Sequence, residues 1–239
     1  MATLIYNSVT VGSIEVVALS RHGGLSKGDY SSLNLANYVG DDPALVAKNI
    51  ELAGSCVGTN KVSIMQGEHG SRVHFVSTSG FANTGDGLVS TTPGLALVAL
   101  AADCVPFAIV DPANGVIAVG HAGWKGVAVN IMQNLVDQFV TGGGDLIHST
   151  AVLGPSICAK CYEVPTSRAT ELRPISPVAV VGDRHIDVSA GVQSVLAKSG
   201  LNVIQIPGCT FEDKQLFSYR RANGKPTGRG GLIVALPSS

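Results

Sequence analysis

Aromatic residues make up only 5% of this chain of 239 residues, and charged residues only 14%. The 16 lysines and arginines are balanced by 17 aspartates and glutamates, and they form no basic run. A protein that follows a nucleic-acid backbone needs clustered positive charge, and one that stacks bases needs aromatic platforms. We therefore expect no nucleic-acid partner and no anionic membrane surface, and we favour a small neutral or locally anionic ligand.

The sequence also lacks long apolar runs and a leader-like start. It has no charge-free stretch of about 18 apolar residues, the length that a membrane-spanning helix requires. Residues 1–24 show no charged segment followed by an apolar block and a cleavage site, so we expect no secretory signal. The cysteines number five, which fits free thiols or metal ligands better than a disulfide framework. These features predict a cytoplasmic protein.

Hydrophobic residues, in contrast, make up 45% of the chain, which is ample for a buried core. No break in composition divides the sequence, so we expect one domain over residues 1–239. The pattern of apolar residues predicts both strands and helices. Strands are expected at 4–9, 14–19, 61–65, 72–77, 95–102, 106–110, 116–120, 150–153 and 231–236, and helices after the capping residue Asp42, at 127–140 and at 187–199.

The rest of the chain is organised around residues 95–127. The three apolar runs in this stretch read as buried strands, and a turn at 111–115 joins the second and third runs in a hairpin. Cys104 follows the first run and His121 follows the third. A thiol and an imidazole at neighbouring strand ends can meet in space although 17 positions separate them.

Further candidates lie at loops and strand ends. His69 follows the strand expected at 61–65, and Arg21 begins a glycine-rich loop after the second strand. Arg220, Arg221 and Arg229 surround a turn before the last strand, and guanidinium forks suit phosphate or carboxylate. Solvated loops are the alternative for all of these arginines.

Two other segments have simpler explanations. The turn at 122–126 leaves backbone N–H groups free for an anion near His121, but its glycines also fit a tight turn with Trp124 in the core. Cys158 and Cys161 have the spacing of a redox pair or a zinc knuckle. No second pair with this spacing exists, so we interpret them as incidental thiols in a loop.

Cys104, His69 and His121 together form a ligand set that suits catalytic zinc. One thiolate and two imidazoles leave the fourth tetrahedral position open. Without a metal, the same residues would form a cysteine nucleophile with a histidine base, as in amidases and cysteine hydrolases. Both interpretations make Cys104 indispensable.

An ordered series of short motifs resembles the purine nucleoside phosphorylase family formerly described as multicopper polyphenol oxidases, or laccases. The resemblance covers nearly the whole chain. The motifs are S-R-H-G-G-L-S-K-G at 20–28, S-L-N-L at 32–35, V-G-D-D-P at 39–43, H-G-S-R-V at 69–73, A-D-C-V-P at 102–106, H-A-G-W-K-G at 121–126, L-G-P-S-I at 153–157, Y-E-V at 162–164, and F-S-Y-R-R with T-G-R at 217–229.

The resemblance implies a layered α/β/β sandwich with mixed sheets, similar to cysteine hydrolases, and zinc held by His69, Cys104 and His121, with copper as the other metal. It implies phosphorolysis of adenosine, inosine, guanosine and methylthioadenosine, and deamination of adenosine. Arg21 is expected to join the catalytic residues. The substrate-binding set expected for the nucleoside and phosphate is Arg21, Lys125, Arg220, Arg221 and Arg229.

The resemblance also implies an alternative, because bacterial members of this family have been described as peptidoglycan editing factors, that is, cysteine-dependent amidases. In that alternative Cys104 is the amidase nucleophile. A laccase activity would need several copper centres, and six histidines are too few for them. The sequence departs from the family pattern at three places. Gln66 stands one residue too far from His69, Lys125 replaces an arginine, and Pro165 replaces a glycine. The sequence favours no particular oligomeric state.

Overall fold

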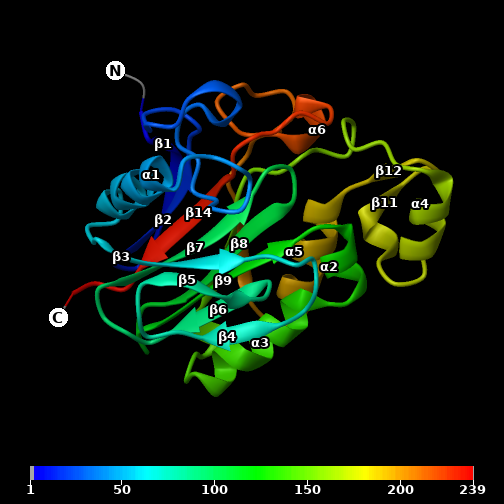
Figure 1. Cartoon of the computed structure of the whole chain (residues 1–239). Helices are drawn as coiled ribbons and strands as arrows, with labels where there is room; N and C mark the ends of the chain where they lie inside the picture. The colour runs from blue at the N-terminus through cyan, green and yellow to red at the C-terminus, as the bar shows by residue number, and fades with distance from the viewer. Residues whose placement is uncertain (1–2, 239) are drawn as a thin grey trace.

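The chain folds into two mixed β-sheets packed face to face, with helices on the outside (Figure 1). The structure is a computed structural model and describes residues 3–238. The first six-stranded sheet has the spatial order β1 (Ile5–Val11), β2 (Ile14–Leu19), β14 (Gly230–Ala235), β7 (Leu95–Ala101), β3 (Lys61–Gln66) and β5 (Gly80–Thr84).

The second sheet, also six-stranded, carries most of the segments singled out in the sequence. Its order is β13 (Asn202–Gln205), β10 (Thr150–Leu153), β8 (Val105–Asp111), β9 (Val116–Ala122), β6 (Gly87–Ser90) and β4 (Val73–Phe75). Strands β8 and β9 form the expected hairpin, in which Pro106 pairs with His121. A small ribbon, β11 (Val180–Val181) and β12 (His185–Ile186), stands apart.

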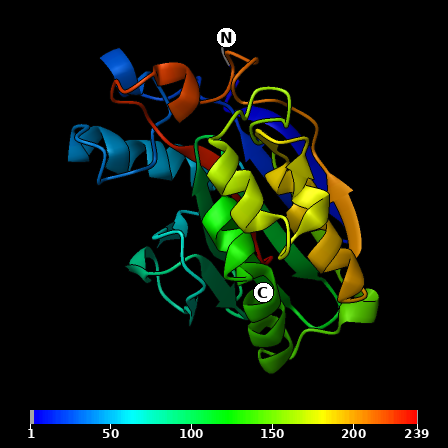
Figure 2. The same ribbon diagram turned by 90° about the vertical axis from the view of Figure 1, so that its right-hand side faces the viewer.

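The helices are α1 (Pro43–Ser55), α2 (Trp124–Ala128), α3 (Ile131–Thr141), α4 (Thr166–Leu172), α5 (Val188–Lys198) and α6 (Tyr219–Ala222), with short 3-10 turns η1 (Gly28–Tyr30), η2 (Leu146–His148) and η3 (Pro177–Ala179). Helix α1 packs on the outer face of the first sheet, and α2, α3 and α5 pack on the outer face of the second. In Figure 2 the green helix α3 and the yellow to orange helices lie in front of the strands. No helix in the described part of the chain has the length and hydropathy needed to cross a bilayer.

Three apolar clusters hold these layers together. Leu97 of β7 and Val110 of β8 lie in the cluster between the two sheets. Phe107 of β8 belongs to a second cluster, which the outer face of that sheet shares with α2, α3 and α5. Val98 of β7 faces the third cluster, under α1. Because successive strand residues point to opposite faces, β7 and β8 are buried on both faces, which explains their unbroken apolar runs.

The expected α/β fold with layered, mixed sheets is confirmed, and α1 adds a helix on the outer face of the first sheet. The expected cap of α1 is also present, since the Asp42 carboxylate accepts the N–H of Ala44 at 2.8 Å. Strand β4 is shorter than predicted and covers only residues 73–75.

The prediction of one continuous helix over 127–140 is wrong. The helix is broken at Asn130, which has a left-handed φ of 58° and separates α2 from α3. Asparagine tolerates this conformation better than other non-glycine residues. The helical spacing was misleading because Val127 in α2 and Ile131 in α3 still pack into the same apolar cluster.

Candidate metal centre and active-site pocket

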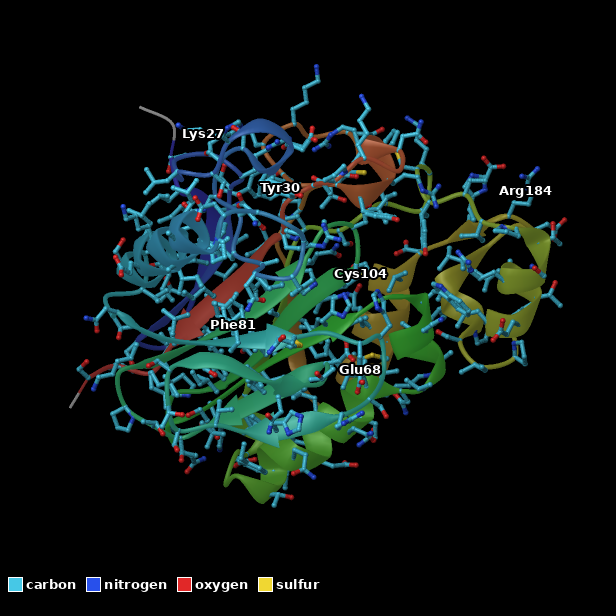
Figure 3. The ribbon with its side chains drawn as sticks, in the orientation of Figure 1. Lys27, Tyr30, Glu68, Phe81, Cys104 and Arg184 are labelled. Carbon is cyan, nitrogen blue, oxygen red and sulfur yellow. The ribbon has the colours of Figure 1, made fainter. Side chains whose placement is uncertain are left out.

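The residues His69, Cys104 and His121 meet at one end of the second sheet. Cys104 occupies the turn through which the chain leaves β7 and enters β8, and His121 is near the end of β9. His69 lies in the loop between β3 and β4. Figure 3 shows Cys104 near the middle of the molecule, with the label of Glu68, the residue before His69, below it.

The donor atoms of these three residues all lie within 4.8 Å of one another. The distance from Cys104 Sγ to His69 Nε2 is 3.8 Å, and the two imidazole rings meet edge to face with centroids 5.0 Å apart. Tetrahedral zinc with ordinary Zn–S and Zn–N bonds sets sulfur and nitrogen about 3.5 Å apart. The three side chains therefore fit around one metal ion.

A buried carboxylate, Asp86, holds both histidines. Its Oδ1 accepts a hydrogen bond from His121 Nδ1 at 2.9 Å, which leaves His121 Nε2 free to face the centre. The N–H groups of Glu68, His69 and Gly70 also donate to this carboxylate, at 3.2, 3.1 and 2.7 Å. Metal-binding histidines commonly have such a carboxylate partner, because it fixes the tautomer and the ring orientation.

The same carboxylate explains the backbone of the His69 loop. His69 has a left-handed φ of 61°, which is rare for a residue with a side chain. Three consecutive N–H groups converge on Asp86 and hold the loop in this shape. The loop after Gln66 is thus anchored to Asp86 through its own backbone N–H groups.

Cys104 is aimed at the centre by its neighbour Asp103, which has a positive φ of 104°. The Asp103 carboxylate accepts the hydroxyl of Thr210 and the N–H of Arg220, both at 2.6 Å. Strained backbone of this kind persists only where surrounding contacts hold it. Gly123 leaves room on the other side, because a Cβ there would lie 2.9 Å from Cys104 Sγ.

The charges around Cys104 favour its thiolate. Burial alone raises the pKa of this thiol, but the charge and hydrogen bond of His121, assisted by His69, lower it to about 6. For His121, burial lowers the pKa, while the Cys104 thiolate and Asp86 raise it more strongly. In the metal-free protein the thiol is consequently ionised at neutral pH, which is the form that binds metals and attacks electrophiles.

A cavity of about 660 Å³ opens above the three ligands. Its wall combines positive charge with aromatic faces: the guanidinium groups of Arg168 and Arg220 lie 4.7 and 5.1 Å from the ring centroids of Trp124 and Tyr162. The cationic side chains that line it are Lys125, Arg168, Arg220 and Arg229, and the aromatic ones are Tyr38, Trp124, Tyr162 and Tyr219. Such a wall suits a ligand with a flat ring and an anionic group.

Arg21 and Arg221 take different positions from those expected. Both line a separate hollow with Lys225 and are absent from the described residues around the three ligands. Arg221 donates to the carbonyls of Thr210, Phe211, Asp213 and Leu216, which makes it a clamp for its own loop. Arg21 stacks on Phe217 and donates to the Ser31 carbonyl at 2.8 Å. The other three members of the expected set, Lys125, Arg220 and Arg229, do line the pocket.

The sequence had assigned no role to three residues of the site, Asp86, Asp103 and Arg168. Asp86 and Asp103 are nearly or fully buried aspartates beside apolar strands, and an acid in that position is a signal that sequence inspection can use. Arg168 lies on the short helix α4, and nothing in its local sequence connects it with the pocket.

Fold and site together define a layered α/β protein with a candidate three-ligand metal centre under a cationic, aromatic pocket. The chain belongs to the multi-copper polyphenol oxidoreductase laccase family, whose model matches residues 15–237. It is 37% identical over 234 residues to a protein of Streptomyces coelicolor named purine nucleoside phosphorylase, an alignment covering 92% of this chain and 94% of that protein.

Two further relatives broaden this picture. A protein of an unknown prokaryotic organism, named adenosine deaminase, is 28% identical over 236 residues, with 89% of this chain and 90% of that protein covered. The crystal structure of a Neisseria meningitidis protein superposes with a TM-score of 0.85 at 26% identity and covers 99% of this chain and 100% of the other. The two named relatives thus carry the names of two different reactions, and the family description names a third.

Proposed function

We propose that this protein is a zinc-dependent purine nucleoside phosphorylase that also deaminates adenosine. The observation that carries the proposal is the position of His69, Cys104 and His121 at the base of a cavity walled by cations and aromatic rings. The names of the similar Streptomyces protein and of the adenosine deaminase support it. Adenosine, inosine, guanosine and methylthioadenosine are the proposed nucleosides.

Zinc is the proposed metal, although two imidazoles and one thiolate are also the ligands of blue-copper centres. Those centres add a weak axial ligand such as methionine, and multi-copper oxidases need further copper sites. Here the described residues around the pocket include no methionine. Within residues 3–238 the other group of potential ligands consists of cysteines and one glutamate, without histidine. This donor set favours one catalytic zinc over a multi-copper oxidase.

Zinc in this centre would supply a Lewis acid and a water whose pKa falls to about 7. The residues of the chain bind and orient the substrate. The rings of Trp124, Tyr162 and Tyr219 offer flat faces for the purine, and the four cations of the wall offer charge for phosphate. Asp86 holds the proton on His121 Nδ1, so that Nε2 keeps its lone pair for the metal.

The two reactions act on different parts of the nucleoside. Phosphorolysis takes place at C1′ of the ribose, whereas deamination takes place at C6 of the base. A single ligand trio cannot lie against both carbons in one pose. We therefore propose that the nucleoside binds in two orientations, with phosphate held by the cationic wall in only one of them.

One observation favours a second candidate, the cysteine-dependent amidase. The lowered pKa of Cys104 and the adjacent His121 are the features of an activated nucleophile and its base. In that function Cys104 would attack an amide of a muropeptide. The same three residues serve both candidates, so substrates have to separate them.

The direct comparison is to incubate the unsubstituted protein with inosine plus phosphate and, separately, with a serine-bearing muropeptide. We expect hypoxanthine and ribose 1-phosphate from the first mixture, and no release of the amino acid from the second. Liquid chromatography with mass detection measures both. Cleavage of the muropeptide without turnover of inosine or adenosine would replace the phosphorylase by the amidase.

The cationic wall leads to a prediction about phosphate. Arg220→Met and Arg229→Met each remove a guanidinium from the pocket. A hydrogen bond to a charged group contributes about 1.5–3 kcal/mol, so the phosphate KM of phosphorolysis should rise roughly tenfold to a hundredfold. Adenosine deamination, which uses no phosphate, should stay within about threefold of the wild type, as should the zinc content of the centre.

The matched control is Arg173→Met, which removes an exposed arginine that pairs with Asp183 outside the pocket. It should leave both activities unchanged. Arg21→Met adds a second comparison, because this side chain lies in the separate hollow. A larger rise in phosphate KM for Arg21→Met than for the pocket variants would contradict the assignment of phosphate to the cationic wall.

A further inference from the structure

A second group of potential metal ligands lies outside the pocket. Cys158, Cys161, Cys209 and Glu212 place their donor atoms within 4.8 Å of one another. None of the four is among the described residues that line the cavity above His69 and Cys104. All five cysteines of the chain are free thiols, so these three sulfur atoms are available as ligands.

The group consists of two turns with the same spacing. Cys158 and Cys161 are separated by two residues in the turn after β10, and Cys209 and Glu212 are separated by two residues in the turn after β13. Structural zinc sites are commonly built from two such half-sites, each contributing two ligands. Sequence inspection found only one of them, because the second contains a glutamate where a cysteine is usual.

The backbone brings the two turns together in a fixed register. Ser156 and Cys209 form a parallel β-bridge, and the N–H of Thr210 donates to the Ser156 carbonyl at 3.1 Å. The N–H of Cys158 donates to Cys209 Sγ at 3.4 Å. Hydrogen bonds from backbone N–H groups to sulfur favour the thiolate, which is the form that binds metal.

We propose that Cys158, Cys161, Cys209 and Glu212 bind a structural zinc ion. Tetrahedral coordination sets such donors about 3.5–3.8 Å apart, so the four side chains need to contract by only about 1 Å. Three thiolates and one carboxylate select a borderline-soft divalent metal over magnesium or calcium. Lys160 also pairs with Glu212 at 3.5 Å, but both side chains are exposed and such pairs are weak.

This ion would tie together the loops that form one wall of the pocket. Ile157 and Tyr162, which line the cavity, immediately flank the turn of Cys158 and Cys161. Thr210, next to Cys209, donates to the Asp103 carboxylate and so supports the backbone that aims Cys104. The role is structural and does not depend on which reaction the pocket carries out.

The experiment counts metal in a background where the first centre is removed. Cys104→Ala protein, purified with reductant and without air and supplied with Zn²⁺, should retain about one zinc per chain by mass spectrometry. Adding Cys209→Ser should remove that zinc, whereas adding Cys56→Ser, which changes a thiol at the end of α1, should retain it. A second readout uses Co²⁺ in place of Zn²⁺. Near-ultraviolet thiolate-to-metal absorption should be roughly three times as strong in the Cys104→Ala single variant, whose remaining site has three thiolates, as in the Cys209→Ser single variant, whose remaining site has one.

A variant with an exposed change covers the case in which Cys209→Ser fails to fold. Glu212→Gln, in the Cys104→Ala background, should keep the fold and lose zinc to a chromogenic chelator roughly tenfold faster or more. The proposal is overturned if Cys104→Ala protein binds no zinc, or if its zinc is insensitive to both Cys209→Ser and Glu212→Gln. A disulfide between any two of the three cysteines in the air-free protein, seen by peptide mapping, would overturn it as well.

Discussion

Cys104→Ala should abolish both proposed activities and empty the metal centre. Removing the thiolate leaves two imidazoles, which are too few to hold zinc tightly. Metal catalysis contributes several kcal/mol, so inosine phosphorolysis and adenosine deamination should both fall roughly a thousandfold or more. Activity assays and metal analysis on the same preparation check this, and the zinc content should fall by one equivalent per chain. His69→Ala and His121→Ala should have the same two effects.

The control for this prediction is Cys56→Ser, which alters a free thiol on the opposite side of the first sheet and should change neither measurement. Parallel loss in all three ligand variants is the signature of a shared metal. Full retention of zinc in each of the three, or deamination that survives removal of zinc by a chelator, would contradict the proposed centre.

Asp86→Asn should weaken metal binding about 10- to 100-fold and destabilise the protein. The carboxylate accepts four hydrogen bonds, from His121 and from three backbone N–H groups, and an amide has only one oxygen to accept them. At least one buried donor then loses its partner, which costs about 1–3 kcal/mol of the free energy of unfolding. Zinc competition with a chelator measures the first effect and denaturant unfolding of the metal-free protein the second.

The pH dependence of this destabilisation follows from the pKa of Asp86. Burial raises this pKa, but the hydrogen bond and charge of His121 and the N–H groups of Gly70 and Glu68 lower it below its usual value. A carboxylate with a lowered folded-state pKa contributes stability above the unfolded-state pKa of about 3.9, and loses it as the pH falls through the folded value. The difference in the free energy of unfolding between wild type and Asp86→Asn should thus be at its full value at pH 7 and shrink below about pH 4.

Asp111 supplies a matched control at the far end of β8. It is equally buried, and its carboxylate accepts the N–H groups of Ala113, Asn114 and Asp145. Asp111→Asn should also destabilise the protein but leave the affinity for zinc unchanged. If both variants lost zinc to the same extent, the role of Asp86 in positioning the ligands would be refuted.

The long buried strands β7, β8 and β9 could be predicted from the sequence because each is an apolar run that ends at a turn, and the three candidate ligands were selected beside such strand ends. Cys104 stands just before β8 and His121 lies within β9, and the hairpin, in which Pro106 pairs with His121, brings them together locally. Such contacts depend on neighbours in the chain. The spacing of strands and the cap of α1 are determined in the same local way.

Features that depend on distant segments were not predictable. Nothing local shows that β7 and β8 belong to different sheets, although only three residues separate them. The direction of Arg220 into the pocket and of Arg221 away from it depends on the loops that each side chain contacts. Cys209 reaches Cys158 only because the two loops pair side by side.

The three central ligands are held by the second sheet and by Asp86, whereas much of the cationic wall above them is not. His121 lies in β9 and Cys104 in the turn that enters β8, but Arg168, Arg220 and Arg229 come from short helices and loops elsewhere in the chain. Changes in these loops can alter which molecule enters the cavity while the ligand geometry stays the same. An ancestral protein of this architecture could acquire a new substrate through few replacements, which offers a physical basis for the divergent activities named among its relatives.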